Sequence, residues 1–180
     1  IPVRQVFFSA EIGQKMAKNA EQADLIIGNN VYAHVPDINS FTDGIANLLK
    51  DDGVVTLEFP HLMQLIEKNQ FDTVYHEHFS YLSLYTVNSI FKKFNLKIFD
   101  VERISTHGGS LRIYGCKKNA NREIKQTVKN ILLLENEAGL QNINTYKSFQ
   151  ESANQVKADF IKFLLDAKLS GKSVAGYGAA

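Results

Sequence analysis

The chain has 180 residues, of which 44% are hydrophobic and 22% are charged, and these values are typical of one folded domain with a buried core. They exclude a disordered or low-complexity protein. Twenty basic and nineteen acidic side chains leave a net charge of +1, which provides no electrostatic field for holding nucleic acid or a membrane surface. We therefore expect no nucleic acid and no membrane as partners.

The only cysteine, Cys116, excludes an intramolecular disulfide and a cysteine-based zinc site. Its place in a β-rich run indicates a core or edge thiol. A cysteine-poor chain is typical of a reducing compartment, and no apolar run approaches the roughly 20 residues of a membrane span. The first residues also lack the pattern of a signal peptide, so we expect a cytoplasmic protein.

The first third of the chain alternates between strand-like and helix-like patterns. Val3–Ser9 is β-rich, and Glu11–Glu21 carries apolar residues at helical spacing. Ala23–Asn30 is an aliphatic run without alternation, which predicts a strand buried on both faces. Ile38–Lys50 has one apolar stripe, and Gly53–Pro60 indicates a second buried strand. This alternation predicts an α/β fold with a parallel sheet and right-handed crossovers.

The middle of the chain is more varied. We expect a short helix over Leu62–Lys68 and then an ordered loop over Phe71–Tyr81, which is rich in aromatic residues and histidine. Apolar spacing predicts a further helix over Leu84–Asn95. Leu96–Thr106 and Ser110–Lys117 are β-like and close enough in sequence to pair antiparallel.

The last third is mostly helix-forming. This pattern extends from Arg122 to about Leu169, with a break predicted at Gly139–Asn144. Ser173–Ala180 indicates a strand that runs into a glycine turn. Because such a turn normally opens into a helix, we expect this sequence to be part of a longer protein.

Polar residues stand where three of the expected strands end, at Ser9, at Asn29 and Asn30, and at His61. Ligands of α/β sheets bind at the carboxyl ends of the strands. The asparagine pair is therefore suited to bind a polar cofactor, with His34 one short turn beyond. The alternative is that the pair only terminates its strand as an Asx turn.

The densest ionisable cluster is Tyr75-His76-Glu77-His78. A zinc site would need its two histidines together with His34 or His107, but no recognised spacing such as H-E-x-x-H occurs, so we expect no metal. Acid–base chemistry is a second interpretation, because histidine titrates near neutral pH and a carboxylate can orient its ring. A third is a structural loop without catalytic duty, which the flanking tyrosines make less attractive.

The segment His107–Ser110 places two glycines between two expected strands, which first of all indicates a hairpin turn. Glycine also lets a ligand approach the backbone, and Ser110 with Arg112 could then bind a phosphate or a sugar hydroxyl. Both interpretations remain open from the pattern alone.

Three stretches carry distinctive motifs: NNVYAHVPDINSF, GVVTLEFPHLMQLIEKNQFDTVYHEHFSYLSL and FNLKIFDVERISTHGGSLRIY. They resemble the sugar C-methyltransferase family that acts on nucleotide-linked keto-deoxysugars, which includes the 3-C-methyltransferases of antibiotic sugar pathways. The likeness runs from about Phe7 to Tyr114 and resumes at Gly176–Ala180. YHEH, HVPD and HGGSLR together are its most specific motifs.

Members of this family have an N-terminal zinc segment, a central S-adenosyl-L-methionine-binding Rossmann-like domain and a C-terminal α/β domain. The resemblance implies that residues 1–118 are the C-terminal portion of the methyltransferase domain, with a partial Rossmann-like class I sheet. Residues 119–169 would be connecting helices, and 170–180 the first strand and glycine turn of a truncated C-terminal α/β domain. The zinc cysteines and the glycine-rich cofactor turn are not among these 180 residues. The resemblance thus implies a fragment, inactive by itself, with zinc only in a missing segment.

The resemblance also implies a site. His78 would be the catalytic base, with Tyr75 and Glu77 beside it and His34 across the pocket. The implied cofactor-binding residues are Phe8, Ser9, Asn29 and Asn30, and the implied substrate-binding residues are His107, Ser110 and Arg112.

The implied reaction is methylation of carbon 3 of a nucleotide-linked 4-keto-deoxysugar. The adjacent carbonyl acidifies carbon 3, so His78 could remove its proton if Tyr75 or His34 donates to the enolate oxygen. The carbon would then attack the methyl group of S-adenosyl-L-methionine without a metal. The alternatives are a methyltransferase of the same fold with another small acceptor, and a non-catalytic α/β binding module.

Overall fold

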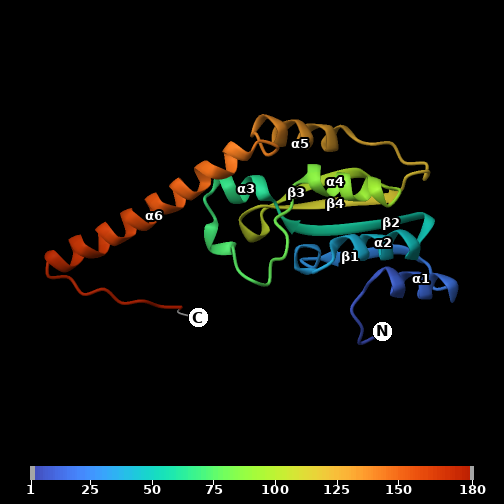
Figure 1. Ribbon diagram of the computed structural model, residues 1–180, viewed down its shortest axis with the longest axis horizontal. Helices are drawn as coiled ribbons and strands as arrows, with labels where there is room; N and C mark the ends of the chain where they lie inside the picture. Colours follow the sequence, from blue (N-terminus) through green and yellow to red (C-terminus); the bar gives the residue numbers. More distant parts are fainter. Residues whose placement is uncertain (1–2, 179–180) are drawn as a thin grey trace. The chain divides into compact units, whose positions relative to one another are not determined.

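The computed structural model describes residues 3–178 and contains one four-stranded sheet (Figure 1). The order of the strands across the sheet is β1-β2-β4-β3. Their bounds are β1 Ala23–Asn29, β2 Leu49–Pro60, β3 Leu96–Ile104 and β4 Ser110–Lys117. The chain divides into two units, Ile1–Leu140 with the sheet and Gln141–Ala180 with a single long helix.

The directions of the strands follow from their pairing. β1 pairs parallel with β2, while β4 pairs antiparallel with both β2 and β3. β3 therefore runs in the same direction as β1 and β2, with one reversed strand inserted between them. The parallel start of the sheet and the antiparallel hairpin of β3 and β4 are confirmed, and so is the α/β fold class.

Six α-helices accompany the strands within residues 3–178, together with three short 3₁₀ turns. The α-helices are α1 Ala10–Lys18, α2 Ile38–Leu48, α3 Leu62–Glu67, α4 Leu84–Lys93, α5 Gln126–Glu137 and α6 Ile143–Leu169. The 3₁₀ turns are η1 Tyr32–His34, η2 Phe71–Thr73 and η3 Thr106–Gly108. The predicted break between the last two helices is confirmed, because α5 ends at Glu137 and α6 begins at Ile143.

Three helices of the sheet-bearing unit begin at a side-chain cap. Ser9 accepts a hydrogen bond from the Ile12 amide at the start of α1, and Asp37 does the same for Ser40 at the start of α2. Ser83 caps α4. Such caps satisfy amides that have no partner within the helix, which fixes where each helix starts.

The core lies between one face of the sheet and helices α2, α4 and α5. Leu57 of β2 and Phe91 of α4 are fully buried in it, and each such side chain contributes roughly 1.5–3 kcal/mol to folding. Tyr32 is also buried, its hydroxyl 2.7 Å from that of Thr42, and burial raises its pKa. Cys116 is a buried core thiol, as predicted, and burial raises its pKa too.

Two expectations about the first strands are wrong. Val3–Ser9 contains no strand, because a β-strand needs a hydrogen-bonding partner and no described strand pairs with this segment. β1 forms as predicted but is not buried on both faces. Ile26 and Gly28 face the core side, whereas Leu25 and Ile27 are 54% and 64% exposed. The described residues leave the second face of β1 uncovered.

The expected strand at the end of the chain is also absent from the described residues. Residues 172–178 have no regular secondary structure and no pairing partner among residues 3–178, and Ala179–Ala180 lie outside the described residues. Across residues 3–178, no helix combines the length and the hydropathy that a membrane crossing requires.

Candidate active site

The site begins at the carboxyl end of β1. Asn30 has φ +52° and donates its amide to the Glu58 carbonyl of β2 at 3.0 Å. Asparagine tolerates this left-handed conformation better than most residues, which supports the strand-terminating interpretation of the pair. The side chains of Asn29 and Asn30 are nevertheless exposed at the sheet edge, so their role in binding a cofactor stays a prediction. The chain then turns into η1, which carries His34.

The loop between α3 and α4 extends beyond the end of β2 that leads into α3 (Figure 1). It is ordered, as predicted, and it returns along η1. The amides of Phe79 and Ser80 both donate to the Ala33 carbonyl, at 2.9 and 3.2 Å. This docking brings His78 of the loop against His34 of η1, although 43 residues separate them in sequence.

His78 is held at both ring nitrogens. Its Nδ1 lies 3.0 Å from the Thr73 carbonyl oxygen, and its Nε2 lies 3.2 Å from the hydroxyl of Tyr75. A carbonyl oxygen can only accept, so Nδ1 carries a proton and the neutral ring has its lone pair at Nε2. Nε2 is therefore the atom of His78 that can take a proton, and here it accepts from Tyr75.

Aromatic contacts fix the orientation of this ring. The Tyr75 ring centroid lies 4.3 Å from that of His78, and Tyr81 meets His78 edge-on at 5.8 Å. The ring of His34 lies 4.7 Å away on another side. The structure thus brings together three of the four predicted catalytic residues as side chains, Tyr75, His78 and His34.

The fourth predicted residue, Glu77, contributes through its backbone. Its carbonyl oxygen lies 2.9 Å from Nδ1 of His34, whose proton must therefore also sit on Nδ1. The Glu77 side chain is exposed. His34 can consequently donate from Nε2 only as an imidazolium, whereas Tyr75 can donate in its ordinary neutral form.

An apolar groove of about 450 Å³ lies beside this end of the sheet, within the range of small-ligand sites. It is lined by Val6, Phe7, Phe8, Ser9, Val31, Val35, Pro36, Asp37, Ser40 and Phe41. Phe8 packs edge-on against Phe41 at 5.3 Å, and Phe7 is 97% exposed. Aromatic walls with a few polar groups are suited to bind a planar ring system. Phe8 and Ser9 both line this groove, and Ser9 also caps α1, so their role in binding a cofactor stays a prediction.

The predicted substrate residues lie on and beside the turn between β3 and β4. The turn is confirmed, and His107 is exposed in it with φ +51°. Ser110 is 2% exposed and donates its hydroxyl to the Thr106 carbonyl. Arg112 donates to the Glu58 carboxylate at 3.0 Å, and Glu102 lies 3.6 Å from its other nitrogen. Ser110 and Arg112 are therefore engaged within the protein, and their contact with a substrate stays a prediction.

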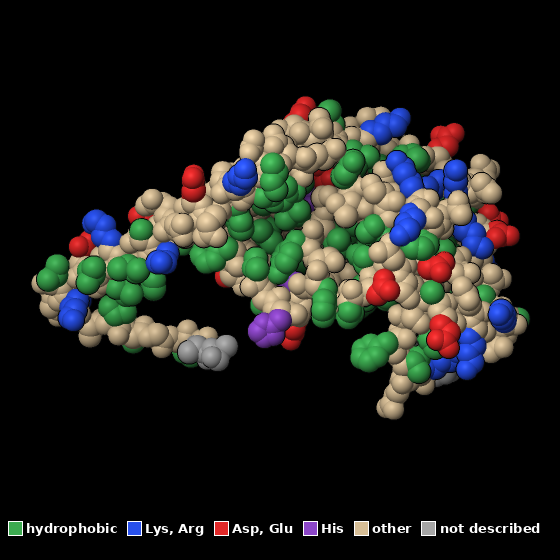
Figure 2. Space-filling model, viewed as in Figure 1, with side chains coloured by type: hydrophobic (Ala, Val, Ile, Leu, Met, Phe, Trp, Pro, Cys, Tyr) green, Lys and Arg blue, Asp and Glu red, His purple; other side chains and the backbone are tan. Residues whose placement is uncertain are grey.

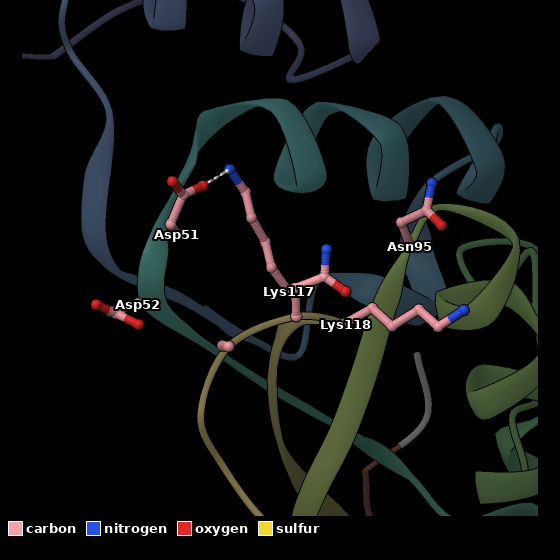
Figure 3. A pocket seen from close by; sticks show the side chains of 7 residues that line it. Asp51, Asp52, Asn95, Lys117 and Lys118 are labelled. Atoms are coloured by element: carbon pink, nitrogen blue, oxygen red, sulfur yellow. Dashed lines mark hydrogen bonds and ion pairs between the residues drawn. The ribbon is translucent and has the colours of Figure 1, made fainter.

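A second hollow, of about 420 Å³, lies at the opposite end of the sheet, between the start of β2 and the end of β4 (Figure 3). Asp51, Asp52, Lys117 and Lys118 line it, and Lys117 pairs with Asp51 at 2.9 Å. This hydrogen bond holds the pKa of Asp51 below its usual value. Because ligands of α/β sheets bind at the carboxyl ends of the parallel strands, this hollow is not the candidate site.

One buried pair was missed by sequence reasoning. His61 and Glu135 are each 1% exposed, and Nε2 of His61 lies 2.8 Å from Oε1 of Glu135. The available signal was the spacing of α5, in which Glu135 follows Val128 and Ile131 on the apolar stripe. A carboxylate at such a position indicates a specific buried partner.

Comparison with known families gives the class of protein. A family model described as a methyltransferase domain matches residues 3–101, which is more than half of the chain. A second model, described as a C-methyltransferase C-terminal domain, matches residues 105–180. The chain therefore belongs to the methyltransferase domain family.

A curated relative makes the likeness more specific. C-methyltransferase NovU from Streptomyces niveus is 36% identical over 172 residues, which cover 96% of this chain and 41% of that protein. The chain thus spans about two-fifths of the length of this relative. The predicted resemblance to C-methyltransferases is confirmed.

Two solved structures are similar to part of this chain. One is magnesium protoporphyrin IX methyltransferase from Synechocystis PCC 6803 with bound SAH, at 14% identity over 53% of this chain and 45% of that chain, with a TM-score of 0.42. Another is M1.HpyAVI, at 13% identity over 64% and 55%, with a TM-score of 0.41. TM-scores this low add nothing to the family assignment.

Proposed function

We propose that the protein transfers a methyl group from S-adenosyl-L-methionine to carbon 3 of a nucleotide-linked 4-keto-deoxysugar, with His78 as the base. The observation that carries this proposal is the cluster of Tyr75, His78 and His34 at the carboxyl end of the sheet, next to an apolar groove. The likeness to a C-methyltransferase supports it.

The geometry of His78 suits proton removal. With Nδ1–H held by the Thr73 carbonyl, Nε2 carries the lone pair that would take the proton from carbon 3. Tyr75 now donates to Nε2, so its hydroxyl has to move to the developing enolate oxygen as substrate binds. That donor would stabilise the charge that appears on the oxygen. The imidazole thereby gains one proton, and the substrate becomes a nucleophile at carbon.

The cofactor would lie in the groove of Phe8 and Ser9, near Asn29 and Asn30. When bound, S-adenosyl-L-methionine supplies an electrophilic methyl group to the carbon nucleophile. The apolar walls of the groove would exclude water from the reacting atoms, and the exposed asparagine amides would bind polar groups of the cofactor.

The same proposal assigns the segments of the chain. Residues 1–118 would be the C-terminal portion of the methyltransferase domain, 119–169 connecting helices, and 170–180 the start of a C-terminal α/β domain. His107, Ser110 and Arg112 would lie toward the sugar nucleotide, where the turn between β3 and β4 meets the same sheet edge.

The test replaces His78 by alanine in the full-length protein. His78→Ala should abolish methyl transfer and also the exchange of the carbon 3 proton with solvent deuterium, which NMR of the substrate measures. The matched control is His76→Ala, because His76 is an exposed neighbour in the same loop. Proton exchange that persists in His78→Ala would show that another group is the base.

The acceptor requires a separate test. A panel of sugar nucleotides with keto groups at different positions, incubated with deuterium-labelled cofactor, is followed by mass spectrometry. Methylation of 4-keto sugars at carbon 3 supports the proposal. Transfer only to another carbon, or only to a hydroxyl, would replace the proposed acceptor and the enolate chemistry.

A further inference from the structure

Glu135 is a fully buried carboxylate on α5 that the proposed chemistry does not use. Its Oε1 accepts from Nε2 of His61 at 2.8 Å and from the Leu84 amide at 2.6 Å. Its Oε2 accepts from the Tyr85 amide at 2.8 Å. A single side chain thus bonds the residue that follows β2 and the first turn of α4.

These two anchor points lie at the two ends of the segment 62–83, called here the His78 loop. His61 immediately precedes the segment 62–83 that carries His78, and Leu84 immediately follows it. The backbone strengthens this closure, because His61 pairs with Leu82 in a short bridge and the Leu62 amide donates to the Leu82 carbonyl at 3.0 Å. Both ends of the segment are therefore held at one carboxylate.

The charge of Glu135 is well compensated. Leu84 and Tyr85 are the first two residues of α4, whose amides have no partner within the helix, and Ser83 caps the third. The positive end of the helix dipole favours an anion at this position. His61 adds a third donor, while its Nδ1 has no hydrogen-bond partner among the described residues.

A buried polar pair of this kind adds little net stability to a core, because both side chains lose their hydration when they are buried. Apolar side chains of similar volume often give equal or greater stability. What apolar packing does not provide is directional hydrogen bonding, which fixes the two ends of the loop relative to each other. The anchor is also linked closely to His78. Leu82, which pairs with His61, is next in sequence to Tyr81, and the ring of Tyr81 packs against His78.

We propose that Glu135 is a positioning residue that holds the His78 loop in its reactive geometry by joining the end of β2 to the start of α4. The predicted effect on rate rests on the proposed function of His78, whereas the effect on the loop does not. Helix α5 would thereby affect the active site only indirectly, through the position of the His78 loop.

The test measures the loop and the reaction in the same full-length variants. Glu135→Gln keeps the shape but replaces one acceptor oxygen by an NH₂ group that faces a backbone donor. Hydrogen–deuterium exchange should rise at Leu84, Tyr85 and residues 71–81, and remain unchanged in β2 and β4. The value of kcat should fall about 100-fold, because even a small misplacement of the reacting groups can slow a reaction by that factor. The affinity for S-adenosylhomocysteine should remain unchanged.

The matched control is Glu137→Gln, because Glu137 is an exposed glutamate on the same helix. Glu135→Asp, which retains the carboxylate, should recover part of kcat. The proposal is overturned if Glu135→Gln lowers thermal stability while loop exchange and kcat match those of Glu137→Gln. Glu135 would then be a stabilising core residue only.

A second pair of variants covers the case in which Glu135→Gln does not fold. His61→Gln keeps an N–H donor near the position of Nε2, while His61→Leu has a similar volume and no donor. The leucine variant should show faster loop exchange than the glutamine variant, and equal exchange would refute the proposal. A His78→Ala protein that still exchanges the substrate proton contradicts the proposed base but leaves this comparison intact.

Discussion

The hydroxyl of Tyr75 is hydrogen-bonded to Nε2 of His78, the atom that we propose as the base. The hydroxyl donates to Nε2 at 3.2 Å while the two rings lie 4.3 Å apart. The hydrogen bond keeps Nε2 aimed in one direction, but it also competes with the substrate proton. The proposed mechanism therefore gives Tyr75 two separable roles, to orient the imidazole through ring contact and to donate to the enolate through its hydroxyl.

Tyr75→Phe separates these roles, because it removes the hydroxyl and keeps the ring. If the hydroxyl stabilises the enolate, kcat and the exchange rate of the carbon 3 proton should both fall about 100-fold, with unchanged cofactor affinity. Tyr85→Phe is the control, since Tyr85 is a half-exposed tyrosine on α4. Faster proton exchange in Tyr75→Phe would mean instead that the hydroxyl only blocks the base.

The sequence predicted which side chains of this cluster lie together, whereas some of their hydrogen-bond partners were visible only in the structure. Tyr75 and His78 were expected together because the cluster is contiguous in sequence. The contribution of Glu77 through its carbonyl was not predictable, since the direction of a backbone carbonyl in a loop does not follow from residue type. Likewise, the pairing of His61 with Glu135 joins residues 74 positions apart, a contact that local patterns do not encode.

At the scale of elements, α5 is tied to β3 by Asp100. This carboxylate accepts from Lys125 at 2.5 Å, from Thr127 at 2.7 Å and from the Val101 amide at 2.9 Å. Partial burial acts to raise the pKa of Asp100, but these hydrogen bonds outweigh it and the pKa lies below its usual value. The start of the helix that carries Glu135 is thereby fixed to the edge of the sheet.

Asp100→Asn should lower the free energy of unfolding by about 1 kcal/mol at pH 7, an effect reduced by the exposure of Lys125. Because the pKa of Asp100 is lower in the folded state, the ionised carboxylate stabilises the fold fully at pH values above its unfolded pKa of about 4. This stabilisation disappears as the pH falls through the folded pKa. Urea unfolding should therefore show a larger difference from wild type at pH 7 than at pH 3.

The control for this measurement is Glu123→Gln, an exposed change near the same segment. An equal loss of stability at both pH values would mean that the ionised form of Asp100 contributes nothing. In that case the shape of the side chain, rather than its charge, fixes α5.

Helix positions were more predictable than strand environments. α2 and α4 begin where Asp37 and Ser83 cap them, and capping is a local signal. The exposure of Leu25 and Ile27 was not predictable, because an aliphatic run is the same whether one face or both are covered. The insertion of β4 between β2 and β3 depends on pairing across the sheet, which local sequence does not encode.

At the scale of the whole molecule, charge is dispersed. Figure 2 shows basic and acidic side chains intermixed on the face drawn there, with neither sign forming a continuous area over the unit that carries the sheet. A polyanion would find no continuous binding surface on that face. An anionic sugar nucleotide would have to be bound by a few local groups, and Arg112 would first have to loosen its pairing with Glu58.

The core of the sheet-bearing unit is complete before residue 141. Every member of the buried cluster lies between Phe8 and Leu132, and α6 has no buried residue. A chain that ends after Leu140 should therefore unfold cooperatively at the same midpoint as the 180-residue chain, as measured by circular dichroism during heating.

The control chain ends after Ala120 and lacks α5. It loses Val128 and Ile131 from the core and leaves His61 without Glu135. Removing two buried aliphatic side chains and one partner of a buried pair costs on the order of 5 kcal/mol, which approaches the whole stability of a typical domain. This chain should not fold. If it unfolds like the longer chains, α5 is dispensable for the fold, and its link to the His78 loop has to be judged on activity alone.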